Sequence, residues 1–382
     1  MMTNVHSAVI LALALYAPLA HSKDFDFSYR GYVELTADRY GINRSAAANQ
    51  MNWMGLPDRR LALAADATFS VRVGGFNSVL EAYSAAGENL SAYPPQSLQK
   101  YLSYTSADKS LFIRAGQVVP NWGVGQIWNP VRDISNEGRR DVIFNNRAIR
   151  GMDLAQIQWV MSENSSLSAY YFPARTGRPA GPAMRFASAI SDFDYALTLF
   201  RGTGEKYRLG AEFSWVLGSA GIVTEVVWSD RNEVSAISPI GAGIHEPGRR
   251  LSYVIGANVA LPNEFNLNIE VYRNGWGFTK DQSKSFSRYL PANMDLYNPL
   301  GNGQKNLYAG LGRHFVQGDS MVTLSAFHNI ESAVTMVRAS METRIGKHAK
   351  ASISLSHYAE PPRDRLINLY RNMVDLRILW SF

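Results

Sequence analysis

Arginine and tryptophan side chains are concentrated in one stretch of the sequence, residues 114–151. A strand-like pattern ends at Pro120, and about thirty residues without a regular pattern follow it, which is typical of a functional loop. Glycines in this stretch allow tight backbone turns. Guanidinium groups that line a narrow passage favour anions, because a low-dielectric throat focuses their field. The chemistry predicted for this stretch is therefore anion selection.

The candidate residues of this stretch are two tryptophans and a charged set in which arginines outnumber acids. They are Arg114, Trp122, Trp128, Arg132, Asp133, Arg139, Arg140, Asp141, Arg147 and Arg150. The tryptophans could anchor the loop against a wall or stack on a sugar ring. The sequence leaves both roles open.

Composition excludes several other kinds of site. The chain has no cysteine, so it has no disulfide framework, no thiolate nucleophile and no haem attachment through cysteine. The formal charge of +6 is spread along the chain, so nucleic acid is not expected as a partner. The histidines are scattered without metal-ligand spacing or a catalytic motif, although His314 and His328 fall on neighbouring predicted strands. We expect no catalytic residue, metal or cofactor.

The N-terminus predicts export. Residues 1–22 are predicted to be a signal peptide, because Ala8 to Ala20 is apolar and Ala20-His21-Ser22 is a cleavage site of small residues. The residues before this apolar run contain no Lys or Arg, whereas a signal peptide usually begins with a positively charged segment. A retained anchor helix is the alternative, but this run is shorter than the roughly 20 residues that a span needs.

Residues 23–382 are predicted to form one β domain. Strand patterns recur along the whole of it, beginning with Phe25 to Asp38, where apolar and polar residues alternate. Most of these patterns run about 9–13 residues, near the length of a tilted membrane strand and above the globular mode of about 5–6. Short turns alternate with long connections, as in barrels with short periplasmic turns and long external loops.

The predicted fold class is therefore all-β, a transmembrane antiparallel up-and-down β-barrel. It has about 18 strands, or about 16 if the patterns within 76–106 or 184–202 are misassigned. Closure pairs every backbone group, as a lipid environment requires. One strand face is apolar. The other carries charges of both signs and is predicted to line the lumen with Arg30, Glu34, Arg72, Arg208, Glu212, Glu270 and Arg338. Aromatic girdles are expected at Tyr29, Trp159, Trp215, Trp228 and Trp380.

Two features resemble Gram-negative outer-membrane barrels. The last strand alternates and stops on Phe382, which is similar to the assembly signal of these proteins. Gly116-Gln117 followed by Trp122-Gly123-x-Gly125-x-x-Trp128-Asn129-Pro130 resembles a run in porin-like and alginate-export-like barrels. By strand count, residues 120–151 form the third external loop, which in porins folds inward as the constriction.

This resemblance implies a porin of the cell outer membrane, a channel for passive diffusion of small polar, preferentially anionic, solutes. The implied partners are outer-membrane lipid and lipopolysaccharide, the barrel assembly machinery through Phe382, a small solute and further copies of the chain. Three alternatives stay open. The barrel could export a polysaccharide or another polymer, it could be an outer-membrane enzyme, and the loop arginines could bind lipopolysaccharide phosphates outside the lumen.

Overall fold

The computed structural model describes most of the chain after its first 24 residues. The described residues are 25–42, 58–88, 93–120, 122–131, 151–174, 180–202, 205–231, 235–236, 244–245, 248–275, 277, 279, 303–315, 319–359 and 370–382. The predicted signal peptide lies outside these residues, as do Arg132, Asp133, Arg139, Arg140, Asp141, Arg147 and Arg150. Within the described residues, no helix is long and apolar enough to cross a membrane.

Strands account for all the regular elements of the described chain. They are β1 (Phe25–Ile42), β2 (Arg59–Val73), β3 (Phe76–Glu88), β4 (Tyr93–Thr105), β5 (Leu111–Val118), β6 (Met152–Ser162), β7 (Ser165–Phe172), β8 (Gly181–Ile190), β9 (Phe193–Phe200), β10 (Glu205–Leu217), β11 (Ala220–Arg231), β12 (Ser235–Ala236), β13 (Ile244–His245), β14 (Gly248–Leu261), β15 (Phe265–Arg273), β16 (Lys305–Phe315), β17 (Ser320–Asn329), β18 (Val334–Ile345), β19 (Ala349–Ala359) and β20 (Tyr370–Ser381).

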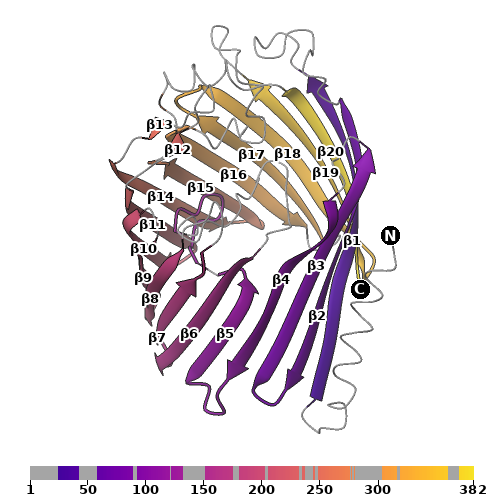
Figure 1. Ribbon diagram of the computed structural model, residues 1–382. Coiled ribbons are helices and arrows are strands. Elements are labelled where there is room, and N and C mark those ends of the chain that lie inside the picture. The colour runs from indigo at the N-terminus through magenta and orange to yellow at the C-terminus, as the bar shows by residue number, and fades with distance from the viewer. Residues whose placement is uncertain are drawn as a thin grey trace.

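The described strands form one closed antiparallel barrel (Figure 1). Eighteen strands belong to this sheet, while β12 and β13 pair only with each other. Consecutive barrel strands pair along the chain, and β1 also pairs with β20, so the sheet has no free edge. The predicted fold class is confirmed, with the count of 18 rather than the lower alternative.

The chain end takes part in this closure. The Phe382 amide donates to the Gly31 carbonyl oxygen at 3.0 Å, and the Gly31 amide donates to the Phe382 carbonyl oxygen at 3.1 Å. A Cβ on Gly31 would lie near the Asp66 carbonyl oxygen and 2.8 Å from a ring carbon of Phe382, so neither the backbone nor the ring leaves room for a side chain there. The terminal aromatic residue therefore completes the pairing of the first and last strands.

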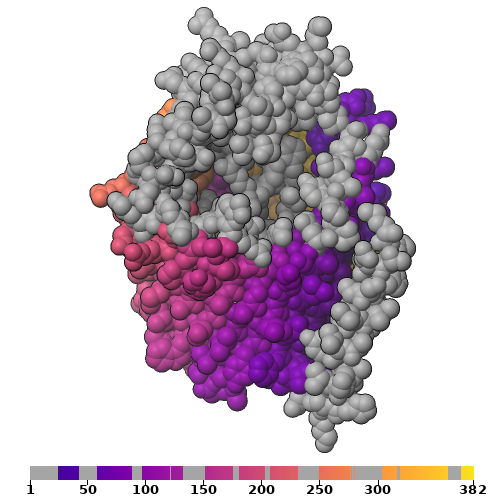
Figure 2. Space-filling view, viewed as in Figure 1, coloured from indigo at the N-terminus to yellow at the C-terminus, as the bar shows by residue number. Residues whose placement is uncertain are grey.

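The two faces of the sheet differ as the alternation predicts. Large apolar side chains point outward and are exposed along the strands, as with Leu63, Leu209, Ile255 and Ile378. The space-filling view shows a continuous outer surface over the purple to red strands, with orange atoms of later strands visible beyond its upper edge (Figure 2). An apolar outer face with inward charges fits a sheet that stands in hydrocarbon.

Four of the predicted girdle aromatics are exposed and lie near one end of the barrel. Tyr29, Trp159, Trp215 and Trp380 are 46–63% exposed and lie at the strand ends joined by short turns or chain termini. Trp228 is less exposed than these four. Aromatic rings near the ends of the strands suit the interface between membrane and water.

Candidate functional site

A segment that follows β5 lies inside the barrel and carries the predicted Trp-Gly-x-Gly motif. We call residues 122–131 the anchored segment. Figure 1 shows it as a purple trace within the ring of strands, near β14 and β15. It contacts the lumen face of the wall, because its partners Glu212, Glu225 and Glu270 are inward residues of β10, β11 and β15.

Three glutamates hold the backbone of the anchored segment. The Gly123 amide donates to Glu212 at 2.9 Å. Glu225 accepts the amides of Val124, Gly125 and Val131 at 2.6, 2.6 and 3.0 Å. Glu270 accepts the amides of Gln126, Ile127 and Trp128 at 2.7–3.2 Å. Carboxylates accept hydrogen bonds from backbone N–H groups more strongly than neutral groups do, so these contacts fix the path of the segment.

Trp122 begins the anchored segment and packs into the wall. Its ring meets Tyr170 edge to face with centroids 5.0 Å apart, and its indole N–H donates to the Tyr170 hydroxyl at 3.3 Å. Phe172 also meets the Trp122 ring edge to face, with centroids 6.0 Å apart. Trp122 is 3% exposed, so its ring offers no face to a solute. Of the two predicted roles for this tryptophan, only anchoring fits its burial.

Trp128 packs at the other end of the segment. Its ring stacks on Tyr272 with centroids 5.4 Å apart, and it meets Tyr308 and Phe327 edge to face. The two tryptophans therefore contact the wall from β7 to β17, a span that the hydrogen bonds to β10, β11 and β15 cross. Apolar packing at both ends restricts how far the segment can shift.

The small residues of the motif permit a tight chain reversal. Gly123 has φ of +88°, and a Cβ there would collide with the Asn129 amide. That amide in turn donates to the Trp122 carbonyl oxygen at 3.0 Å. A Cβ on Gly125 would collide with the Trp128 carbonyl oxygen. Each small residue lies where the returning backbone leaves no room for a side chain.

Gln117 precedes the anchored segment in the same motif, and its side chain binds the chain on both sides of the loop. Its side-chain amide donates to the carbonyl oxygens of Ser97 and Gly151 at 3.1 and 3.2 Å. Gly151 directly precedes β6, where the chain returns to the wall. Gln117 thereby connects both ends of the loop that contains the anchored segment.

The predicted wall residues differ in how far they are exposed to the lumen. Arg30 and Arg72 are exposed, and Arg114 is half-buried with its guanidinium 5.1 Å from the Tyr101 ring centre. Arg338 donates to Ser354 at 2.8 Å. Other members are enclosed: Arg208, Glu212 and Glu270 are 3%, 2% and 1% exposed. Glu212 and Glu270 thus differ from the expected solvated wall, because the anchored segment covers them.

Two residues that hold the anchored segment or its partner Glu212 were not among the site residues predicted from the sequence. Glu225 is fully buried and binds three amides of the segment, yet its alternating position marked it only as one inward acid among several. Arg185 holds Glu212, with one contact at 2.9 Å and a second, shorter one. The signal in the sequence was a row of inward glutamates opposite a glycine-rich loop.

A second enclosed charge cluster lies at the closure of the barrel. Asp38 of β1 and Asp375 of β20 are direct cross-strand partners and are 4% and 3% exposed. Arg60 donates to Asp38 at 2.6 Å, and Arg377 donates to Asp375 at 2.8 Å. Arg377 also lies 3.9 Å from Glu34, another predicted wall residue. Each acid has its own arginine, which offsets the cost of burying like charges together.

The histidines do not assemble into a site among the described residues. His314 pairs with Met321 and His328 pairs with Leu307, so the two histidines lie seven pairs apart along β16 and β17. His328 contacts Thr335 at 2.9 Å. No group of three metal-ligating side chains is found within the described ranges. His314 and His328 lie on neighbouring strands, as predicted, but they do not approach each other, because the register separates them.

Comparison with known proteins yields similarity of fold. No family model matches the chain, and no curated protein matches it. A mutant Rh. blastica porin superposes with a TM-score of 0.51 at 10% identity, covering 94% of this chain and 100% of that one. A triple mutant of Rhodopseudomonas blastica porin gives 0.50 at 9% identity, with the same coverage. The chain therefore has a porin-like barrel fold.

Proposed function

We propose that the chain is an outer-membrane channel for passive diffusion of small polar solutes, with anions preferred. In this proposal residues 120–151 narrow the lumen. The observation that carries it is the binding of the anchored segment by Glu212, Glu225 and Glu270 inside a closed barrel. A barrel of this strand number is wide enough for an aqueous channel unless something fills it, so a held inward segment sets the width.

The same contacts support the anion preference. The three glutamates direct their oxygens at backbone amides of the anchored segment and are at most 2% exposed. A solute in the lumen therefore does not meet these carboxylates directly. Arg30 and Arg72 are exposed on the inward face. Enclosing these three glutamates while leaving Arg30 and Arg72 accessible favours anions in a narrow passage.

The rival functions have less support. A polymer conduit needs a wide, smooth passage, whereas the anchored segment projects into the lumen and is packed at both ends by Trp122 and Trp128. An enzyme needs a nucleophile or base within reach of a partner group, and the register keeps His314 and His328 apart. The small-solute channel explains the inward segment without further assumptions.

The test is conductance of the refolded protein in a planar bilayer under a salt gradient. We expect stable open channels and a reversal potential that indicates anion preference. Replacing Arg139 and Arg140 by Ala should reduce that preference if the loop lines the passage. Cation preference in the unmodified protein would refute the selectivity, and a preparation with no channels would refute the diffusion function.

A further inference from the structure

We propose that a cavity beside the anchored segment binds an uncharged, hydroxyl-rich solute such as a sugar. This inference rests on the proposed channel function, because the cavity opens to the lumen that the solute would cross. It adds a binding step to passive diffusion. The site lies on the lumen face of β6 to β10.

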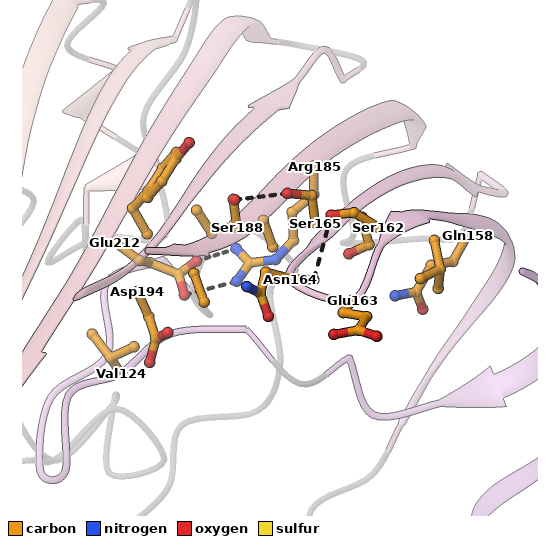
Figure 3. A pocket seen from close by; sticks show the side chains of 16 residues that line it. Val124, Gln158, Ser162, Glu163, Asn164, Ser165, Arg185, Ser188, Asp194 and Glu212 are labelled. Carbon is orange, nitrogen blue, oxygen red and sulfur yellow. Dashed lines mark hydrogen bonds and ion pairs between the residues drawn. The ribbon is translucent and has the colours of Figure 1, made fainter. Parts of the chain in front are cut away.

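The cavity measures about 430 Å³, within the range of small-molecule pockets. Turn residues Glu163 and Asn164 form its far end, so it lies toward the short-turn mouth of the barrel. Val124 of the anchored segment contributes to the lining on the opposite side. Figure 3 shows these side chains around one space, with Val124 and Glu212 at one side and Glu163 and Gln158 at the other.

Several polar side chains in this lining have no partner within the described chain. These are the amides of Gln158 and Asn164, the hydroxyl of Ser166, and the carboxylates of Glu163 and Asp194. Nearby, Ser165 and Ser188 bond to each other at 2.8 Å, as the dashed line in Figure 3 shows. The cavity therefore presents both donors and acceptors that a ligand could satisfy.

The charges of the lining exclude an anion as the ligand. Arg185 is the one cation among the lining residues, and its guanidinium is bound to Glu212 and to the Thr198 hydroxyl. Glu163 and Asp194 are exposed, and their acidic side chains line the space. An ammonium group would satisfy these acids, but it could not accept hydrogen bonds from the amides of Gln158 and Asn164. A hydroxyl group donates and accepts, so a polyol matches the whole set.

The experiment measures sucrose binding to the refolded full-length mature barrel in detergent by saturation-transfer NMR. The variant is Asp194→Ala, and the matched control is Asp192→Ala, which removes an acid from the adjacent turn outside the cavity lining. We expect Asp194→Ala to weaken sucrose binding about ten- to a hundredfold, as for loss of one hydrogen bond to a charged group. The control should bind sucrose as the unmodified protein does.

Two comparison solutes sharpen the result. Gluconate should bind more weakly than sucrose because it is an anion, and methylammonium should bind more weakly because it has no hydrogen-bond acceptor. Stronger binding of either compound, equal sucrose binding by the two variants, or no sucrose binding would overturn the proposal. Bilayer conductance of the same preparation separates the two ideas. Open channels without sucrose binding refute only the cavity, whereas sucrose binding without channels refutes only the diffusion function.

Discussion

Glu212 on β10 and Glu225 on β11 are direct cross-strand partners, and both side chains are buried on the lumen face of the barrel. Like charges opposite each other destabilise a sheet. In this barrel each of the two carboxylates has other partners. Glu212 binds Arg185 and the Gly123 amide, while Glu225 binds three amides of the anchored segment. The anchored segment and Arg185 thus supply the partners that offset repulsion between the two carboxylates.

Removing Glu225 should release the anchored segment. Glu225→Ala leaves the amides of Val124, Gly125 and Val131 without their acceptor, at a cost of about 1–3 kcal/mol for each group that stays buried. We expect faster amide hydrogen exchange across 122–131 and a larger, noisier single-channel conductance. Glu342→Ala is the control, since Glu342 is partly exposed and binds Lys350 far from the segment. Unchanged exchange in Glu225→Ala would contradict the anchoring role.

Breaking the Arg185–Glu212 pair should destabilise the barrel more than removing both charges. Arg185→Ala leaves the buried carboxylate of Glu212 without its guanidinium partner, and such losses cost about 3–5 kcal/mol. The thermal unfolding midpoint should fall. Adding Glu212→Gln should recover part of that loss, because the buried charge is then absent. A double variant no more stable than Arg185→Ala would argue against a charge-based effect.

Trp122 should hold the anchored segment in place through packing of its ring more than through its hydrogen bond. Trp122→Ala removes a ring that is 3% exposed between Tyr170 and Phe172, which should cost about 3–5 kcal/mol locally. Trp122→Phe keeps an aromatic ring and loses the bond to the Tyr170 hydroxyl, at about 1 kcal/mol. Limited proteolysis within 122–131 should follow the order Ala, Phe, unmodified protein. Equal cleavage of the two variants would assign the effect to the hydrogen bond instead.

Gly123 and Gly74 offer a matched pair of substitutions. Both have positive φ, at +88° and +54°. A Cβ on Gly123 would collide with Asn129, whereas a Cβ on Gly74 has nothing within 4 Å. Gly123→Ala should therefore displace the anchored segment and alter conductance, while Gly74→Ala should cost only about 1 kcal/mol of backbone strain. Similar conductance changes in both would show that crowding at Gly123 is unimportant.

The turn between β4 and β5 should respond to acid. Hydrogen bonds from Ser106 and Ser110 lower the pKa of the Asp108 carboxyl from 3.8 to about 2. A lowered pKa means that the ionised carboxylate stabilises the turn at pH values above 3.8, and that this contribution is lost as pH falls through about 2. Carboxyl chemical shifts followed over that range should show the low midpoint. In Ser106→Ala the midpoint should move upward. An unmoved midpoint would show that the Ser106 hydroxyl does not lower the pKa of Asp108.

The barrel could be predicted from residue order alone. Period-two alternation is a local property, since successive side chains of a strand point to opposite faces. It therefore predicted the strand segments, their apolar outer face and the charged inner face. The alternation of short and long connections indicated the strand count and put residues 120–151 in the third long connection, where the structure has the chain between β5 and β6.

Which inward charges meet the loop depends on the folded chain. Gly125 and Glu225 are 100 residues apart in sequence, and their contact requires barrel closure and the inward fold of the segment together. Alternation could place Glu212, Glu225 and Glu270 on the inner face, but it could not separate a solvated acid from one covered by backbone amides. The docking of 122–131 makes that distinction, because burial and hydrogen-bond partners are properties of the tertiary structure and not of residue spacing.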